Sequence, residues 1–134
     1  MNYSELTRRY FDSAGVAGVL SGDCVGRGAA GTRRMGTWVQ FDIQLEPGIE
    51  PQRRIVAARF LAFGCPHTIA VAAWVCERAV GTFCAVALPE PAQALCRRFE
   101  APAEKLGRVL VIEDAWAAAA AAAAAVATAR VTIS

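Results

Sequence analysis

The only histidine of the chain lies two positions after a cysteine, in the stretch Phe63-Gly64-Cys65-Pro66-His67-Thr68. A thiol and an imidazole at this spacing can ligate one metal ion, or can act as nucleophile and base. The alternative is that Cys65 is a small buried residue and His67 a polar residue at the start of a helix. Local sequence leaves both interpretations open, because a single Cys-x-His pattern is a weak signal.

The neighbouring segments predict that this pair lies in a turn between a strand and a helix. Residues 55–63 are rich in Val, Ile and Phe, which predicts a strand. Residues 68–80 are apolar on most faces, which predicts a buried helix that ends at Gly81. Pro66 suits the first turn of that helix. Cys65 is then expected at the N-cap, where the helix dipole favours a thiolate over a thiol.

The part of the chain before this unit predicts one helix and two strands. Residues 3–11 carry apolar side chains at helical spacing, with Ser4 as a cap. Residues 26–31 match Gly-x-Gly-x-x-Gly, but a strand follows where a dinucleotide-binding motif needs a helix. We therefore expect a glycine-rich strand or loop that passes close to other backbone. Residues 38–45 alternate as a half-buried strand, and a turn over 47–51 leads to the next strand.

The part of the chain after this unit predicts helices. Pro89-Glu90-Pro91 begins a helix that runs to about Phe99, and a short helical turn follows over residues 102–106. Residues 109–112 form a short apolar run. Glu113-Asp114 then favour a helix N-terminus, and the alanines of residues 117–125 make the last helix certain to form.

Strands followed by helices indicate an α+β fold, with a three-stranded antiparallel sheet and helices packed on one of its faces. The 134 residues predict a single domain, 1–134, in which residues 128–134 are a tail. A hydrophobic fraction of 55% and a charged fraction of 19% are typical of a globular protein.

Composition also indicates the cellular compartment and the classes of binding partner. The polar first ten residues carry no export signal, and the five cysteines are an odd number at irregular spacings, so we expect reduced thiols and a cytoplasmic protein. Cys76 and Cys84 are expected to pack in the core. The net charge of +2 predicts no nucleic-acid or membrane partner. The four arginine pairs are either a solvated surface or a patch for an acidic partner.

Three stretches of this chain resemble the NifU/IscU family of iron–sulfur cluster scaffold proteins. The first is the glycine pattern of residues 26–31 followed by Met35-Gly36-Thr37, where the family has Cys-Gly-Asp. The second is Phe63-Gly64-Cys65-x-x-x-Ile69-Ala70, and the third is residues 105–115, ending in Glu113-Asp114-Ala115. The resemblance covers roughly residues 3–127 and implies a NifU/IscU-like fold.

The family holds a cluster or zinc with three cysteines, helped by an aspartate and a histidine. At the matching positions Met35 replaces the first cysteine and Thr37 the aspartate, while Cys65 keeps the second cysteine. Gly107 and Arg108 replace the histidine and the third cysteine. The resemblance therefore implies an iron–sulfur cluster or zinc as cofactor, but this chain keeps only one ligand of the family's set, Cys65.

Methionine is a poor ligand for zinc or ferric iron, and Arg108 places a positive charge where the family has a thiolate. A single thiolate cannot hold a [2Fe–2S] cluster, which needs four ligands. His67 and Cys24 are the two residues that can serve as substitute ligands for a metal at Cys65.

Two interpretations follow, neither of them an enzyme. The first is a cluster assembly scaffold with a degenerate metal site. The second is a protein-interaction module of the same fold that binds no cluster, whose partner by resemblance is a cysteine desulfurase or a chaperone. There Arg108 neutralises the Cys65 thiolate, which is a persulfide acceptor or a simple salt-bridged thiol. A thiol enzyme using Cys65 and His67 lacks an orienting group and an oxyanion site. The oligomeric state stays open.

Overall fold

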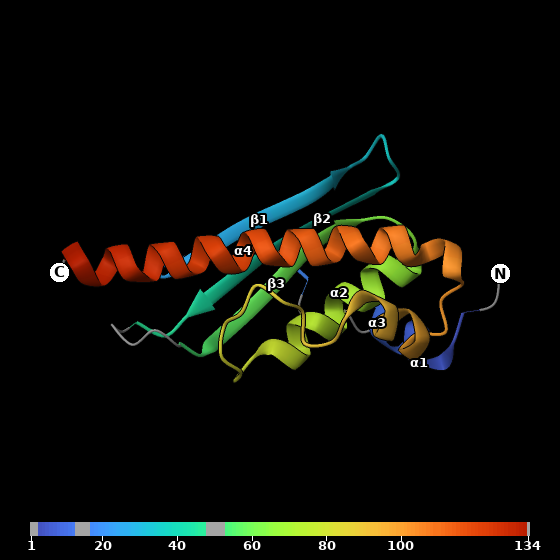
Figure 1. Cartoon of the computed structure of the whole chain (residues 1–134), viewed down its shortest axis with the longest axis horizontal. Coiled ribbons are helices and arrows are strands. Elements are labelled where there is room, and N and C mark those ends of the chain that lie inside the picture. Colours follow the sequence, from blue (N-terminus) through green and yellow to red (C-terminus); the bar gives the residue numbers. More distant parts are fainter. Residues whose placement is uncertain (1–2, 13–16, 48–52, 134) are drawn as a thin grey trace.

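The computed structural model describes residues 3–12, 17–47 and 53–133, with side chains as far as Ala127 (Figure 1). Its elements follow in the order α1 (Glu5–Asp12), β1 (Val25–Thr32), β2 (Thr37–Leu45), β3 (Ile55–Phe63), α2 (Pro66–Ala79), α3 (Ala92–Arg98), a 3₁₀ turn (Ala103–Lys105) and α4 (Leu106–Ile133). Most of the predicted turn over residues 47–51 lies outside the described residues.

The three strands form one antiparallel sheet in the order β1-β2-β3, as predicted. Successive side chains of β2 point to opposite faces of the sheet, and Val39, Phe41 and Ile43 are fully buried on one of them. On the other side Asp42 is buried by partners from two segments. It accepts hydrogen bonds from the Arg27 guanidinium and from the backbone N–H of Leu20.

Helices cover the face of the sheet that Phe41 shares, which confirms the predicted α+β arrangement. Helix α4 lies along β1 and β2, and α2 packs on β3 (Figure 1). Helix α1 packs on α2, and its N-cap Ser4 accepts a hydrogen bond from the N–H of Thr7. The hydroxyls of Ser4 and Thr7 both donate to the carbonyl of Phe99, so the end of α3 is tied to the start of α1.

The glycines of β1 let α4 approach the sheet backbone to backbone. A Cβ atom added to Gly26 would lie 2.0 Å from the backbone nitrogen of Ala123, and one added to Gly28 would lie 2.2 Å from that of Ala119. Atoms cannot approach so closely, so only glycine fits at these two positions. The predicted close passage of this strand by other backbone is thereby confirmed.

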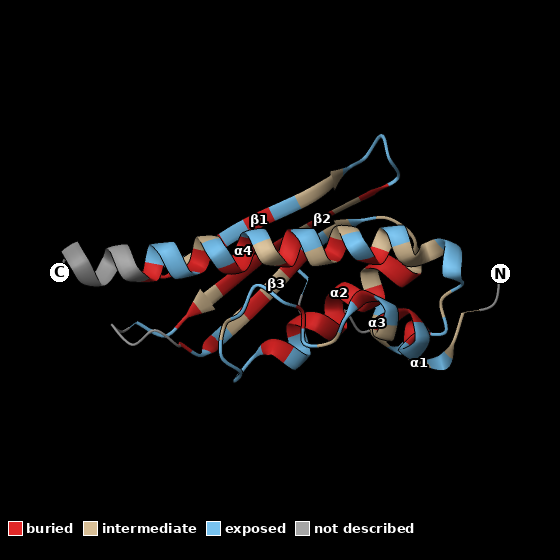
Figure 2. Ribbon diagram, in the orientation of Figure 1, coloured by how far each residue is buried: buried red, intermediate tan, exposed pale blue. Residues whose placement is uncertain are grey.

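The start of the last helix was predicted too late in the chain. Helix α4 begins at Leu106, so residues 109–112 lie within it and Glu113-Asp114 are not at its N-terminus. Burial explains the difference, because Val109 and Ile112 face the core while Leu110 is 41% exposed. This is helical spacing inside an apolar run, and Figure 2 shows buried residues recurring along α4. The helix also continues through residues 128–133, where we expected a tail.

The helical stretch Ala103–Ala127 is long and apolar enough to cross a membrane by length and composition. The packing of Ala119 and Ala123 against the sheet accounts for its composition differently. Helix α4 needs small residues for this contact with β1, so its alanine content follows from packing on the sheet.

We expect Gly28→Ala to lower the free energy of unfolding by about 1–3 kcal/mol or more, because the added methyl group forces α4 away from β1. Gly107→Ala is the matched control. A Cβ there meets nothing within 4 Å, so alanine should raise the free energy of unfolding by up to about 1 kcal/mol. Urea unfolding followed by circular dichroism measures both, and equal stabilities would contradict the contact.

Candidate functional site

Cys65 lies where β3 gives way to α2, at the end of the sheet that also carries the β1–β2 turn. It is the N-cap of α2, Pro66 occupies the first turn and the carbonyl of Cys65 accepts the first helical hydrogen bond from Ile69. Gly81 follows the helix with a φ of +88°. This local geometry is as predicted.

The half-buried thiol of Cys65 is surrounded by groups that stabilise its anion. Burial raises its pKa, but hydrogen bonds from the backbone N–H and hydroxyl of Thr68, from Arg108 and from the N–H of His67 outweigh it. The result is a pKa of Cys65 below that of an ordinary thiol. The Thr68 hydroxyl is 3.6 Å from the sulfur. Arg108, at the position of the family's third cysteine, thus favours the anion of Cys65, the one cysteine of the family's ligand set that remains.

His67 lies beside Cys65 in sequence but faces a different environment. It is 2% exposed, and its ring packs edge to face on Tyr3 with the centroids 4.8 Å apart. Burial first, and then the charges of Lys105 and Arg108, lower the pKa of His67, which favours the neutral imidazole. Its Nδ1 has no hydrogen-bond partner among the described residues. The contacts of the two side chains therefore give no nucleophile–base pair.

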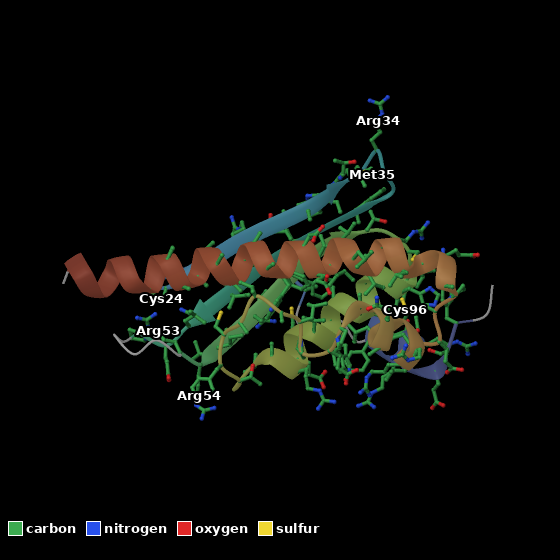
Figure 3. All side chains as sticks on the ribbon, viewed as in Figure 1. Cys24, Arg34, Met35, Arg53, Arg54 and Cys96 are labelled. Carbon is green, nitrogen blue, oxygen red and sulfur yellow. The ribbon has the colours of Figure 1, made fainter. Side chains whose placement is uncertain are left out.

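The remaining positions of the family's ligand set contribute no metal donor of the expected kind. Met35 is 69% exposed at the tip of the β1–β2 turn, where Figure 3 shows it beside Arg34. Thr37 is buried at the start of β2. Gly107 has open space around its Cα, in the first turn of α4.

The structure does not bring Cys24 to Cys65. Cys24 precedes β1, and its carbonyl accepts a hydrogen bond from Leu45 at the far end of the sheet from Cys65. The strands between these ends are eight or nine residues long, which is about 25–30 Å. Figure 3 accordingly shows Cys24 at the end of the molecule where β2 finishes. As a substitute ligand for a metal at Cys65, Cys24 was the wrong choice.

No group of three or more His, Cys, Asp or Glu side chains that could hold a metal ion occurs among the described residues. The donor set at Cys65 is one thiolate, with the guanidinium of Arg108 as its partner. Zinc sites and clusters need about four ligands, so these residues do not fit either group. What the arrangement supports chemically is a thiolate stabilised by the positive charge of Arg108.

Sequence reasoning missed three residues of this site. Thr68 was named only as the end of the stretch around Cys65 and was given no role, although its position three residues after the N-cap predicts a contact of this kind. Lys105 acts on His67 through its charge, and Tyr3 covers the imidazole. No local pattern indicated either contact, since both residues come from distant parts of the chain.

The family model for the NifU-like N terminal domain matches residues 2–128 of this chain. The chain belongs to the NifU-like N-terminal domain family. It therefore has the fold that the residue motifs implied, and the family's proteins are assembly scaffolds rather than enzymes. No curated protein matches the sequence significantly.

Among solved structures, the chain is similar to a protein from the thermophile Fervidobacterium islandicum AW-1, described as an iron–sulfur cluster assembly scaffold for the SUF system. The TM-score is 0.59, and the match covers 90% of this chain and 96% of the other. The sequences are only 12% identical, so the likeness shows that the fold is shared.

Cys65 should be the cysteine that iodoacetamide alkylates fastest near neutral pH, because a thiol with a lowered pKa is more fully ionised there. Burial raises the pKa of Cys76, Cys84 and Cys96 instead. We expect Arg108→Gln to shift the pH profile of Cys65 alkylation to higher pH, as measured by mass spectrometry of quenched samples.

Arg97→Gln is the control for that substitution, since Arg97 lies on α3 and influences Cys96 rather than Cys65. Its Cys65 profile should match that of the wild type. An Arg108→Gln profile that also matches would show that the guanidinium does not stabilise the thiolate.

Proposed function

We propose that this protein takes part in iron–sulfur cluster assembly as a scaffold-like protein with a degenerate metal site, which holds no cluster with its own side chains alone. What carries the proposal is that Arg108 stands at the position of the family's third cysteine and lowers the pKa of the Cys65 thiol. A cation at the position of a ligand stabilises the remaining thiolate and competes with any metal for it.

The chemistry of the other positions supports the same proposal. Thr37 and Gly107 bring neither thiolate nor imidazole, and the thioether of Met35 is a poor ligand for zinc or ferric iron. His67 is close in sequence, but its buried ring is packed on Tyr3. A cluster at this place would therefore depend on ligands from a partner molecule.

Anaerobic reconstitution with iron and sulfide, together with a zinc titration, tests this proposal. For the wild type we expect no visible-region cluster spectrum and no stoichiometric zinc site. A cluster or zinc site that appears in the wild type and is lost in Cys65→Ala would overturn the degenerate site and support a rebuilt ligand set. His67→Ala then tests the imidazole as its second ligand.

A variant with the family's ligands restored is the matched positive control. It combines Met35→Cys, Thr37→Asp, Gly107→His and Arg108→Cys. The open space at Gly107 admits a histidine side chain, and the side chain at position 108 already influences the Cys65 thiol. We expect this variant to bind zinc. Failure of the folded variant to bind would mean that the backbone of the site, and not only its residues, departs from a metal site.

The alternative function is an interaction module that accepts sulfur from a cysteine desulfurase, and the stabilised Cys65 thiolate favours it. The Cys65 thiolate would attack the outer sulfur of the desulfurase persulfide and break the S–S bond. The desulfurase cysteine would leave as a thiolate, and the outer sulfur would remain on Cys65. A chaperone is the other partner that the family implies. The cytoplasmic location remains a prediction.

Incubation with a desulfurase and cysteine distinguishes the sulfur acceptor from the scaffold-like protein. Mass spectrometry should show that the peptide containing Cys65 gains one sulfur atom. Arg108→Gln should slow this transfer near neutral pH, because less of the thiol is ionised. A wild type that gains no sulfur on Cys65, although it binds the desulfurase, would exclude the sulfur-acceptor role.

A further inference from the structure

Strand β1 is an edge strand, and its outer edge pairs with no described segment. Figure 1 shows it on the side of the molecule away from α2. The opposite edge strand, β3, is covered by other segments. Ala17 pairs with Phe60, and the N–H of Gly18 donates to the Phe60 carbonyl. At the start of β3 the N–H of Ile55 donates to the carbonyl of Thr82. Among the described residues, β1 is therefore the strand whose outer edge is open.

The hydrogen bond from the N–H of Leu45 to the carbonyl of Cys24 determines which backbone groups of β1 point outward. Opposite residues of two antiparallel strands alternate between pairs that exchange hydrogen bonds and pairs that do not. Cys24 and Leu45 are of the first kind, so Gly26 and every second residue after it bond to β2. The N–H and C=O groups that point away from the sheet belong to Val25, Arg27, Ala29 and Gly31. No backbone hydrogen bond from another described segment reaches them.

Strand β1 lacks the features that protect an exposed sheet edge from pairing. Such edges usually carry lysine, proline or a bulge, and β1 has none of these along its pairing with β2. Its one charged residue, Arg27, is held toward β2. The Nε atom of Arg27 lies 2.8 Å from Oδ1 of Asp42, and the Nη2 atom lies 2.9 Å from Oδ2. The charge of this edge is thus neutralised within the chain.

We propose that β1 pairs antiparallel with β1 of a second copy of this chain, so that the two sheets become one continuous sheet. The outward groups and the charge select the register. With Gly28 opposite the partner's Gly28, Arg27 faces the partner's Ala29 and Val25 faces the partner's Gly31, so all outward groups bond. A register centred on Arg27 would place two arginines directly opposite each other, which is destabilising. A register centred on Ala29 would leave Val25 without a partner.

Helix α4 presents small side chains beside this edge. The Cβ atom of Ala118 lies 2.7 Å from the place of a Cβ added to Gly28, yet Ala118 is exposed. It therefore lies over the outer side of β1, because Ala119 and Ala120, which face the sheet and the core, are buried. Ala122 follows one turn later and lies on the same side of the helix. Alanine at these positions lets two helices approach to about 8 Å.

This helix face makes a second copy the favoured occupant of the edge. A specific interface buries about 1,200–2,000 Å² in total, more than two short strands supply, so the helices must take part. A two-fold axis through Gly28 brings Ala118 close to the partner's Ala118, and each contact is made twice. Antiparallel pairing places the two Cys65 thiols at opposite ends of the joined sheet. The second copy therefore adds no ligand to the site at Cys65, and the proposal is independent of the chemistry there.

Analytical ultracentrifugation of the full chain tests the pairing. We expect a concentration-dependent dimer with twice the chain's mass of 14.2 kDa. Ala29→Pro removes an N–H that bonds only across the interface, so it should raise the dimer dissociation constant at least about tenfold. Position 29 also faces the partner's Arg27, so Ala29→Lys should weaken the dimer more than Ala29→Glu does.

Ala118→Arg tests the helix contact without changing the strand. It places a long charged side chain at the symmetry axis and should abolish the dimer, while arginine at this exposed position keeps the helix stable in the monomer. Ala124→Arg is the matched control, because Ala124 is also exposed on α4 but lies about 120° around the helix from Ala118. It should leave the dimer unchanged, and circular dichroism should show the same helix content in both variants.

A wild type that is monomeric at every soluble concentration would overturn self-pairing and would leave the edge to a strand of another protein. A dimer that persists in both Ala29→Pro and Ala118→Arg would also overturn it, since the chains would then meet through another surface. Equal weakening by Ala118→Arg and Ala124→Arg would assign the effect to added charge and would reject the proposed geometry.

Discussion

The contact of α4 with the two glycines of β1 determines where the rest of the fold can lie. Gly26 and Gly28 are two residues apart on a strand, a rise of about 6.6 Å. Their partners Ala123 and Ala119 are four residues apart on a helix, a rise of about 6 Å. The two spacings agree, so strand and helix can meet at both points only in antiparallel directions and in one register.

That register is what carries Arg108 to Cys65. From Ala119 back to Arg108 the helix extends about 16 Å, past the end of β1 and toward the turn that follows β3. Cys65 lies at this same end of the sheet because β3 runs antiparallel to β2. A side chain more than forty positions away in sequence thus influences the Cys65 thiol, and the residue at position 108 decides whether that influence comes from a ligand or a cation.

Much of this could be predicted from local sequence. Three local patterns predicted elements that the structure contains. Alternation predicted strand β2, the proline after Cys65 predicted the start of α2, and Gly81 predicted its end. The start of α4 was misjudged because the apolar run at residues 109–112 hides its helical spacing until the buried side is known. The buried state of His67 could not be predicted, because Tyr3 and Lys105 reach it from distant segments.

Helix α2 contributes to the site at Cys65 through its dipole. Its 14 residues span about 21 Å, and Cys65 is the N-cap at its positive end. The dipole favours an anion at this end, so it acts in the same direction as the hydrogen bonds that lower the pKa of the Cys65 thiol. A cation at position 108 and a helix N-terminus at position 65 therefore stabilise the same thiolate from two segments of the chain.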